Sequence, residues 1–213
     1  MKLKRVALKT AVSKLNYSNN KAFYTSAIKL YGTSAKGVNW HSKQTQNIRF
    51  KTILNFLPQD ISTCSIGDAG CGFGDFYNYM IKKKKTPSSY IGLDFLDEMC
   101  SIAEQNTGKE ILLKDICKDK LPFADYYVCS GAMNTLSKFD THLFIQNCYS
   151  TCSEGFIFNI LYGDKNSETY NYMNLEQIQR IAQDLDVKEV LLKDDYLEND
   201  ITVGFFKRRR EDL

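Results

Sequence analysis

Long apolar runs are missing from this sequence of 213 residues. No run approaches the roughly 18 apolar residues that a membrane-spanning helix needs, so we expect no membrane segment. Charge of one sign is also scarce, because 28 Lys and Arg residues nearly balance 25 Asp and Glu residues, for a formal net charge of +3. The basic runs Lys82–Lys85 and Lys207–Arg210 are typical of solvated element ends. The composition therefore disfavours a nucleic-acid partner.

Histidine is scarce as well, and the cysteines lack the spacing of a metal site. The only two histidines, His41 and His142, lie far apart, and the seven cysteines contain no C-x-x-C pair. Cys64 and Cys129 lie inside apolar runs and are expected to be small buried residues. The sequence therefore predicts no metal centre and no disulfide framework, and the free thiols favour a reducing, cytoplasmic location.

The chain does contain a regular alternation of short apolar runs and helical patterns after residue 59. This alternation predicts an α/β fold of three layers, with a mostly parallel seven-stranded sheet covered by helices on both faces. The last two strands are joined by a short acidic loop, so they predict a C-terminal hairpin with one antiparallel strand. The predicted strands are Thr63–Gly67, Tyr90–Leu93, Glu110–Lys114, Tyr126–Ser130, Gly155–Ile160, Lys188–Leu192 and Ile201–Lys207, and the predicted helices are Asp75–Lys83, Leu96–Gln105, Thr141–Thr151 and Asn174–Leu185.

The first part of the chain has a different character. Residues 1–58 are polar and aromatic with few strand signals, and they close with a helical pattern over Asn47–Leu57 that stops at Pro58. We therefore divide the chain into an N-terminal helical segment, residues 1–58, and one α/β domain, residues 59–213.

A glycine-rich loop, Asp68–Asp75 (DAGCGFGD), follows the first predicted strand and opens the first predicted helix. Alternate glycines allow a backbone to pass close to a ligand. A dinucleotide frame, G-x-G-x-x-G, would need another glycine at position 75 or 77, where Asp75 and Tyr77 stand. The carboxylates of Asp68 and Asp75 would also repel a pyrophosphate at the helix start, whereas they would attract a cation. The loop therefore favours a positively charged ligand.

The complete D-x-G-x-G-x-G pattern resembles motif I of the class I S-adenosylmethionine-dependent methyltransferases. Tyr90–Asp94 (YIGLD) and Leu112–Ile116 (LLKDI) resemble the second and third strands of this family, in the right order. The resemblance covers residues 60–207. It implies a Rossmann-like methyltransferase fold, S-adenosylmethionine as the cofactor, and methyl transfer as the reaction.

The resemblance also assigns roles to individual residues. It implies that Asp94 holds the ribose hydroxyls, that Asp115 accepts from the adenine amino group, and that the amide of Ile116 meets a ring nitrogen. Ser130 would lie on the methyl-transfer side, and Arg49 is a candidate partner for the methionine carboxylate or for an acid on a helix face. The complete predicted set of cofactor residues is Asp68, Gly70, Gly72, Gly74, Asp94, Phe95, Met99, Asp115, Ile116, Ser130 and Arg49.

The methyl acceptor is expected to meet segments on either side of the cofactor. In small-molecule members of the family an N-terminal segment commonly folds over the cofactor as a lid, and by that resemblance Tyr31 and Trp40 are acceptor-pocket candidates. His41 is the candidate general base, and Tyr162, after the fifth strand, is a further acceptor-binding candidate. Each of these residues could instead serve only packing or surface roles.

The sequence also bears on the kind of acceptor. Ser130–Met133 does not contain the Asn/Asp-Pro-Pro-aromatic motif of enzymes that methylate base or glutamine amino groups. Val128 stands where RNA cytosine methyltransferases carry proline before a nucleophilic cysteine. Both observations disfavour those classes of enzyme. Because the sequence shows no separate substrate domain and no long basic insertion, we predict transfer to an oxygen or nitrogen of a small molecule. An RNA or protein methyltransferase and a non-catalytic S-adenosylmethionine-binding protein are the alternatives.

Overall fold

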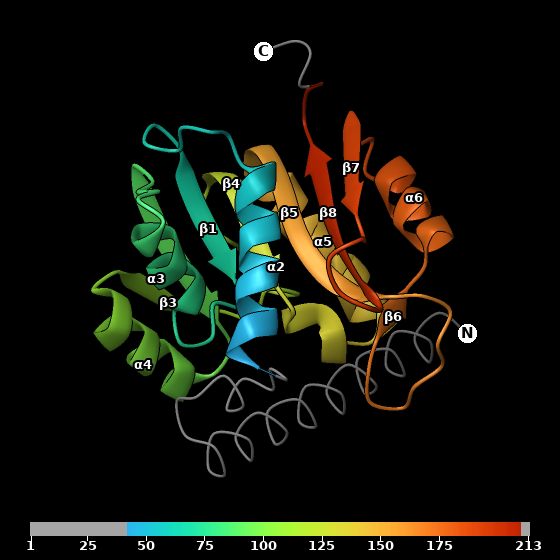
Figure 1. Ribbon diagram of the computed structural model, residues 1–213, viewed down its shortest axis with the longest axis horizontal. Coiled ribbons are helices and arrows are strands. Elements are labelled where there is room, and N and C mark those ends of the chain that lie inside the picture. Colours follow the sequence, from blue (N-terminus) through green and yellow to red (C-terminus); the bar gives the residue numbers. More distant parts are fainter. Residues whose placement is uncertain (1–41, 210–213) are drawn as a thin grey trace.

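The computed structural model describes residues 42–209 (Figure 1). They form a three-layer α/β fold around a mixed sheet whose main path runs β3-β2-β1-β4-β5-β8-β7. The elements are α2 (Lys43–Phe56), β1 (Ser65–Ala69), α3 (Asp75–Lys82), β2 (Ser89–Asp94), α4 (Asp97–Thr107), β3 (Glu110–Leu113), β4 (Ala124–Ser130), η2 (Ala132–Thr135), α5 (Lys138–Thr151), β5 (Cys152–Tyr162), β6 (Tyr172–Met173), α6 (Leu175–Asp184), β7 (Glu189–Lys193) and β8 (Asp200–Phe206).

The predicted sheet is confirmed in its seven main strands and in its terminal hairpin. Strand β8 runs antiparallel to both β5 and β7, whereas the other described pairings are parallel. The two-residue strand β6 pairs with the end of β5 and was not predicted. Two residues are too few to produce an alternating pattern, so the sequence holds no signal for it.

Strand β1 begins two residues later than predicted, at Ser65 instead of Thr63. The preceding residues form a turn in which the Cys64 amide donates to the Ile61 carbonyl over 3.0 Å. As a result Asp68 lies inside the strand, paired with Gly92 of β2, and is 3% exposed. The predicted strand, Thr63–Gly67, ended one residue before this acid.

Two apolar cores hold the layers together. On one face α2, α3 and α4 pack against residues such as Val128 and Ile157, and on the other α5 and α6 pack against Cys129 and Phe158. Neighbouring residues of each strand thus point to opposite faces and are buried on both, as expected for a sheet covered on two sides. Figure 1 shows α2 in front of the sheet and α5 behind it.

Helix α2 is the described part of the predicted N-terminal segment, residues 1–58. Ser42 caps its start by accepting from the Thr45 amide, and its apolar side chains Phe50 and Ile53 are buried in the same core as α3. Helix α2 contacts β4, β5, β8 and α3. This helix therefore packs as part of the α/β layers, and a domain boundary at residue 58 stays a prediction. Within residues 42–209, no helix has the length and apolarity needed to cross a membrane.

Candidate functional site

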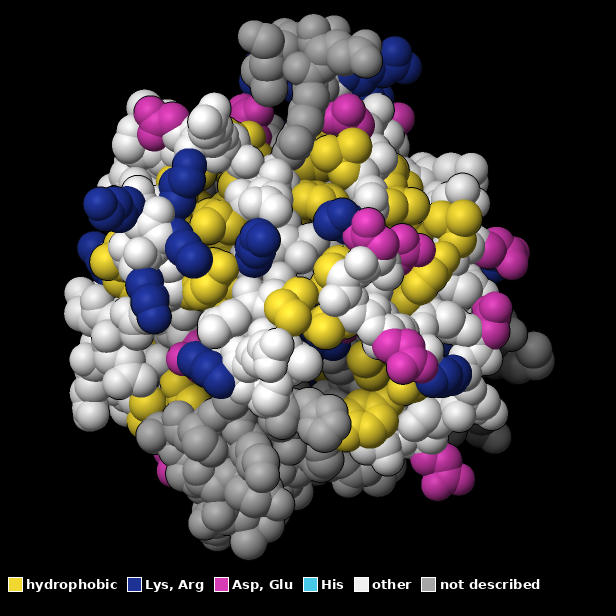
Figure 2. Space-filling model, viewed as in Figure 1, with side chains coloured by type: hydrophobic (Ala, Val, Ile, Leu, Met, Phe, Trp, Pro, Cys, Tyr) yellow, Lys and Arg dark blue, Asp and Glu magenta, His cyan; other side chains and the backbone are white. Residues whose placement is uncertain are grey.

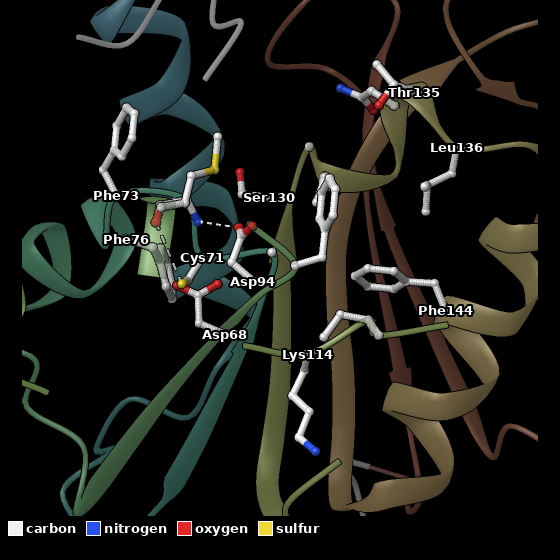
Figure 3. Close-up of a pocket in the computed structure, with 18 of the residues that line it drawn as sticks. Asp68, Cys71, Phe73, Phe76, Asp94, Lys114, Ser130, Thr135, Leu136 and Phe144 are labelled. Atoms are coloured by element: carbon white, nitrogen blue, oxygen red, sulfur yellow. Dashed lines mark hydrogen bonds between the residues drawn. The ribbon is translucent and has the colours of Figure 1, made fainter. Parts of the chain in front are cut away.

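A pocket opens at the carboxyl ends of β1, β2 and β4, beside the first turns of α2 and α3. Ligands of open α/β sheets bind at this edge. Figure 3 shows Phe73 and Phe76 on one side of the pocket and Leu136 and Phe144 on the other, with Asp94 between them. Aromatic and aliphatic side chains thus form much of the two walls, and charged groups lie both at the glycine loop and beyond the end of β3.

The glycine loop has the backbone that its sequence demands. Gly70, Gly72 and Gly74 have φ values of 75°, 56° and 79°, a region that other L-residues rarely adopt. A Cβ at Gly70 would lie 2.4 Å from the Cβ of Ala132, so the loop passes against η2 without room for a side chain. Gly70 and Gly72 line the pocket, whereas Gly74 precedes the first residue of α3 and packs against α4.

Asp94 ends β2 and is held in place by the backbone. Its Oδ2 accepts from the Gly72 amide over 3.0 Å and its Oδ1 accepts from the Leu96 amide over 3.1 Å. Burial raises the pKa of Asp94 to about 6, and these amides act against that rise. Because each carboxylate oxygen can accept two hydrogen bonds, each keeps a position for a further donor. Asp94 therefore fits a diol.

Asp68 lies deeper, 3% exposed, and lines the same pocket. Burial raises its pKa to about 7, the hydroxyl of Tyr90 lowers it by donating over 2.7 Å, and the charges of Asp94 and Asp75 raise it further. Three carboxylates within electrostatic reach of one another can ionise together only at a cost in free energy. A cationic ligand would remove that cost, in agreement with the charge predicted for the ligand.

Asp115 lies beyond the end of β3. Its Oδ1 accepts from the Cys117 amide over 3.0 Å, and its Oδ2 forms an ion pair with Lys118. Asp115 and Lys118 line the pocket together with Ile116. The carboxylate is therefore fixed at the end of the pocket farthest along the sheet from β4, which is where the family resemblance puts adenine.

A buried polar network connects the pocket to the terminal hairpin. Arg49 forms an ion pair with Asp200 of β8, and Tyr196 donates to the other oxygen of that carboxylate. From the pocket side, the Ser130 hydroxyl donates to Asn159 over 2.9 Å. Asn159 in turn donates to Thr202 and Tyr196, which closes the network. Burial lowers the pKa of Arg49 to about 10, and the guanidinium stays charged at neutral pH.

The first turn of α2 contributes a second polar group of residues. Lys43 donates to Asp75 Oδ1 over 2.7 Å, and Gln46 Nε2 donates to Asp75 Oδ2 over 3.0 Å. Gln46 and Asp75 both line the pocket. Asp75 is thus paired with two side chains of α2.

The structure brings together nearly all the predicted cofactor residues. Each of them lines the pocket except Gly74. Arg49 forms an ion pair with Asp200 of β8, an acid on a strand and not on a helix face as considered from the sequence, and its pairing with the methionine carboxylate stays a prediction. Tyr162 ends β5 and does not line the pocket, whereas Tyr170 in the following loop does. Tyr31, Trp40 and His41 lie outside the described residues, and their roles stay predictions.

Several pocket residues escaped the sequence analysis. Gln46 lies one residue before the predicted helix Asn47–Leu57, because the helix begins at Lys43. Asn134 and Tyr170 come from two different segments of the chain. The backbone amide of Asn171, next to Tyr170, donates to the carbonyl of Asn134 over 2.7 Å, and this bond holds Tyr170 at the pocket. The cap signal of Ser42 could have revealed Gln46, but no local pattern reveals a contact between two loops. Within residues 42–209, no cluster of three or more ligating side chains suits a metal ion.

Comparisons with known proteins agree with the geometry. Residues 67–158 match the family model of a methyltransferase domain. A comparison with curated proteins found no match in sequence.

Solved structures share the fold at low sequence identity. The magnesium protoporphyrin IX methyltransferase from Synechocystis PCC 6803, with S-adenosylhomocysteine bound, superimposes with a TM-score of 0.64 at 12% identity, covering 94% of this chain and 100% of that one. A Leishmania major S-adenosylmethionine-dependent methyltransferase has a TM-score of 0.67 at 15% identity, covering 86% and 82%. The pyocyanin biosynthetic protein PhzM has a TM-score of 0.64 at 13% identity, covering 86% and 61%.

Proposed function

We propose that this chain, a member of the class I S-adenosylmethionine-dependent methyltransferases, transfers the methyl group to an oxygen or nitrogen atom of a small-molecule acceptor. The bound cofactor would supply a methyl group already activated on a sulfonium. The task left to the protein is to orient the two reactants and to exclude water.

The side chains of the pocket suit that cofactor. Asp94 keeps acceptor positions for the ribose hydroxyls, and Asp115 lies at the end where adenine would bind. Asp68 adds a buried carboxylate near the place of the cationic part. Phe76 and Phe144 provide apolar walls that would keep water from the reacting atoms.

The main observation in favour of a small acceptor is the position of the two basic runs, Lys82–Lys85 and Lys207–Arg210. The run Lys82–Lys85 begins at the last residue of α3, whereas Asp75 at the start of the helix lines the pocket. The described part of Lys207–Arg210 follows Phe206, which pairs with Gly155 near the amino end of β5. Both runs thus lie at the edge of the sheet opposite the pocket. An RNA acceptor would need cations beside the pocket to bind its phosphates. Of the three described basic residues that line the pocket, Arg49, Lys114 and Lys118, two form ion pairs with acids of the chain, Asp200 and Asp115.

Figure 2 agrees with this distribution. Lys and Arg side chains gather on one side of the face shown, over the region of α3 in Figure 1. Structural neighbours named for magnesium protoporphyrin IX and for N-acetylserotonin have small-molecule acceptors in their names and share this fold. They support the same class of acceptor without identifying it.

The acceptor would enter between η2, the start of α5 and the loop after β5. Thr135, Leu136 and Tyr170 line this side of the pocket and combine apolar surface with two hydroxyl groups. His41 is the proposed base where the acceptor must lose a proton, and it lies outside the described residues.

Transfer of a radiolabelled methyl group tests the proposal. The purified protein is incubated with labelled S-adenosylmethionine and, in separate reactions, with a small-metabolite extract, total RNA or a protein extract. We expect label only in the small-metabolite fraction, and none with the variant Asp94→Ala. Salt-sensitive labelling of RNA, or labelling of protein alone, would contradict the proposed acceptor class.

A further inference from the structure

Gln46 of α2 carries a polar atom that the described part of the protein leaves unpaired. Its side chain is 1% exposed and lines the pocket. Among residues 42–209, no donor bonds to its Oε1. A buried amide oxygen without a donor has lost its hydrogen bonds to water, and no protein donor replaces them, which costs free energy. Such atoms therefore commonly serve a ligand or a function.

The orientation of this amide is decided by its neighbour. Gln46 Nε2 donates to Asp75 Oδ2 over 3.0 Å, while Lys43 binds Oδ1 of the same carboxylate over 2.7 Å. An ionised carboxylate accepts hydrogen bonds and cannot donate them. Only the nitrogen of the amide can therefore face Asp75, and the oxygen must face away from it. The rotation that would exchange the two atoms would bring two acceptors together.

The position of Gln46 indicates which part of the cofactor it would meet. The pocket runs along the sheet in the order β3-β2-β1-β4, from Asp115 past Asp94 to Ser130. Asp94 bonds to the Gly72 amide within the glycine loop, whereas Gln46 bonds to Asp75 at the end of the loop. Helix α2 also contacts β4, the strand that ends at Ser130. If Asp94 holds the ribose, the group that follows it toward α2 is the methionine part of the cofactor.

We propose that Gln46 Oε1 accepts a hydrogen bond from the α-ammonium group of the cofactor's methionine part. This inference rests on the proposed function, and it adds a specificity residue outside the glycine loop. The surrounding charge favours the ammonium over the carboxylate, because Gln46 bonds to Asp75, and Asp68 lines the same pocket within electrostatic reach of Asp75. An acceptor oxygen next to two carboxylates would repel a third.

The test compares three ligands by calorimetric titration: S-adenosylmethionine, S-adenosylhomocysteine and 5′-methylthioadenosine. The third keeps the nucleoside and the sulfur but has no amino-acid part. In Gln46→Leu we expect the dissociation constants of the first two to rise about tenfold or more, as for the loss of a hydrogen bond to a charged group. The constant for 5′-methylthioadenosine should change by less than about twofold.

Two further variants separate recognition from distortion. Gln46→Lys keeps a donor for Asp75 but removes the acceptor oxygen, so it should weaken the two amino-acid ligands at least as much as Gln46→Leu. Gln44→Leu alters an exposed residue of the same helix and should leave all three affinities unchanged.

The outcomes distinguish this inference from the proposed function. An equal loss for all three ligands in the Gln46 variants, or an unchanged affinity for S-adenosylmethionine, would overturn the role of Gln46 alone. A wild-type protein that binds none of the three ligands would overturn the proposed function and the inference together.

Discussion

Arg49 of α2 and Asp200 of β8 form a buried ion pair beside the pocket. Asp200 is 2% exposed and Arg49 is 9% exposed, and Tyr196 donates to the same carboxylate. The pair joins the helix that carries Gln46 to the antiparallel strand of the terminal hairpin. The first and last described parts of the chain thus position one wall of the pocket together.

Breaking this pair should destabilise the fold. Asp200→Asn leaves the Arg49 charge buried without its carboxylate, so we expect the free energy of unfolding to fall by about 3–5 kcal/mol. Urea denaturation measures this change. Asp195→Asn, which alters an exposed acid paired with Lys193, is the matched control and should have little effect. Equal stabilities of the two variants would contradict a stabilising role for the pair.

Asp94→Ala should remove most of the affinity for S-adenosylmethionine without unfolding the protein. The variant deletes the acceptor that we propose for the ribose hydroxyls and the observed acceptor of the Gly72 amide, so the glycine loop also loses an anchor. Calorimetric titration measures the affinity, and circular dichroism checks the fold. Asp97→Ala, an exposed acid three residues later, should bind as the wild type does. Normal binding by Asp94→Ala would mean that the ribose site has been assigned to the wrong strand.

Gly70→Ala should damage the loop more than Gly108→Ala. Both glycines have positive φ, 75° and 62°, so alanine is strained at either position. Only at Gly70 does the new Cβ meet a neighbour, Ala132 at 2.4 Å, whereas at Gly108 no atom lies within 4 Å. We expect about 1 kcal/mol of destabilisation for Gly108→Ala from backbone strain, and a larger loss for Gly70→Ala. Thermal unfolding with and without S-adenosylmethionine tests both, and equal effects would contradict the close contact with η2.

The stability of the ligand-free protein should carry a pH dependence from Asp68. Its pKa rises from 3.8 to about 7 in the folded protein, chiefly through burial. Between these values the folded state keeps a proton that the unfolded state releases, so the contribution of Asp68 to stability falls as pH rises. Denaturant titrations from about pH 4 to about pH 8 should show a smaller fall for Asp68→Asn than for the wild type. Identical curves would contradict the raised pKa.

Most of the fold was predictable from local patterns. Alternating apolar runs identified the seven main strands, since those strands are buried on both faces and long enough to show a pattern. The first strand was displaced because Thr63 and Cys64 are apolar enough to extend the pattern but lie in a turn. Strand β6, at Tyr172–Met173, was too short to predict.

The candidate site was predictable only where one local motif carries it. Asp68, Gly70 and Asp94 follow from strand ends and glycine spacing. The partnership of Arg49 with Asp200 joins residues 151 positions apart, and no pattern within one element encodes it. The same holds for the contact of Gln46 with Asp75, which depends on how α2 packs against α3.

The most direct test of the account is calorimetric titration of the wild-type protein with S-adenosylmethionine, repeated with NADH. The three carboxylates at the glycine loop predict that S-adenosylmethionine binds with a dissociation constant on the order of micromolar and that NADH, which carries a pyrophosphate, does not bind. Binding of NADH alone, or of neither ligand, would contradict the assignment of the pocket.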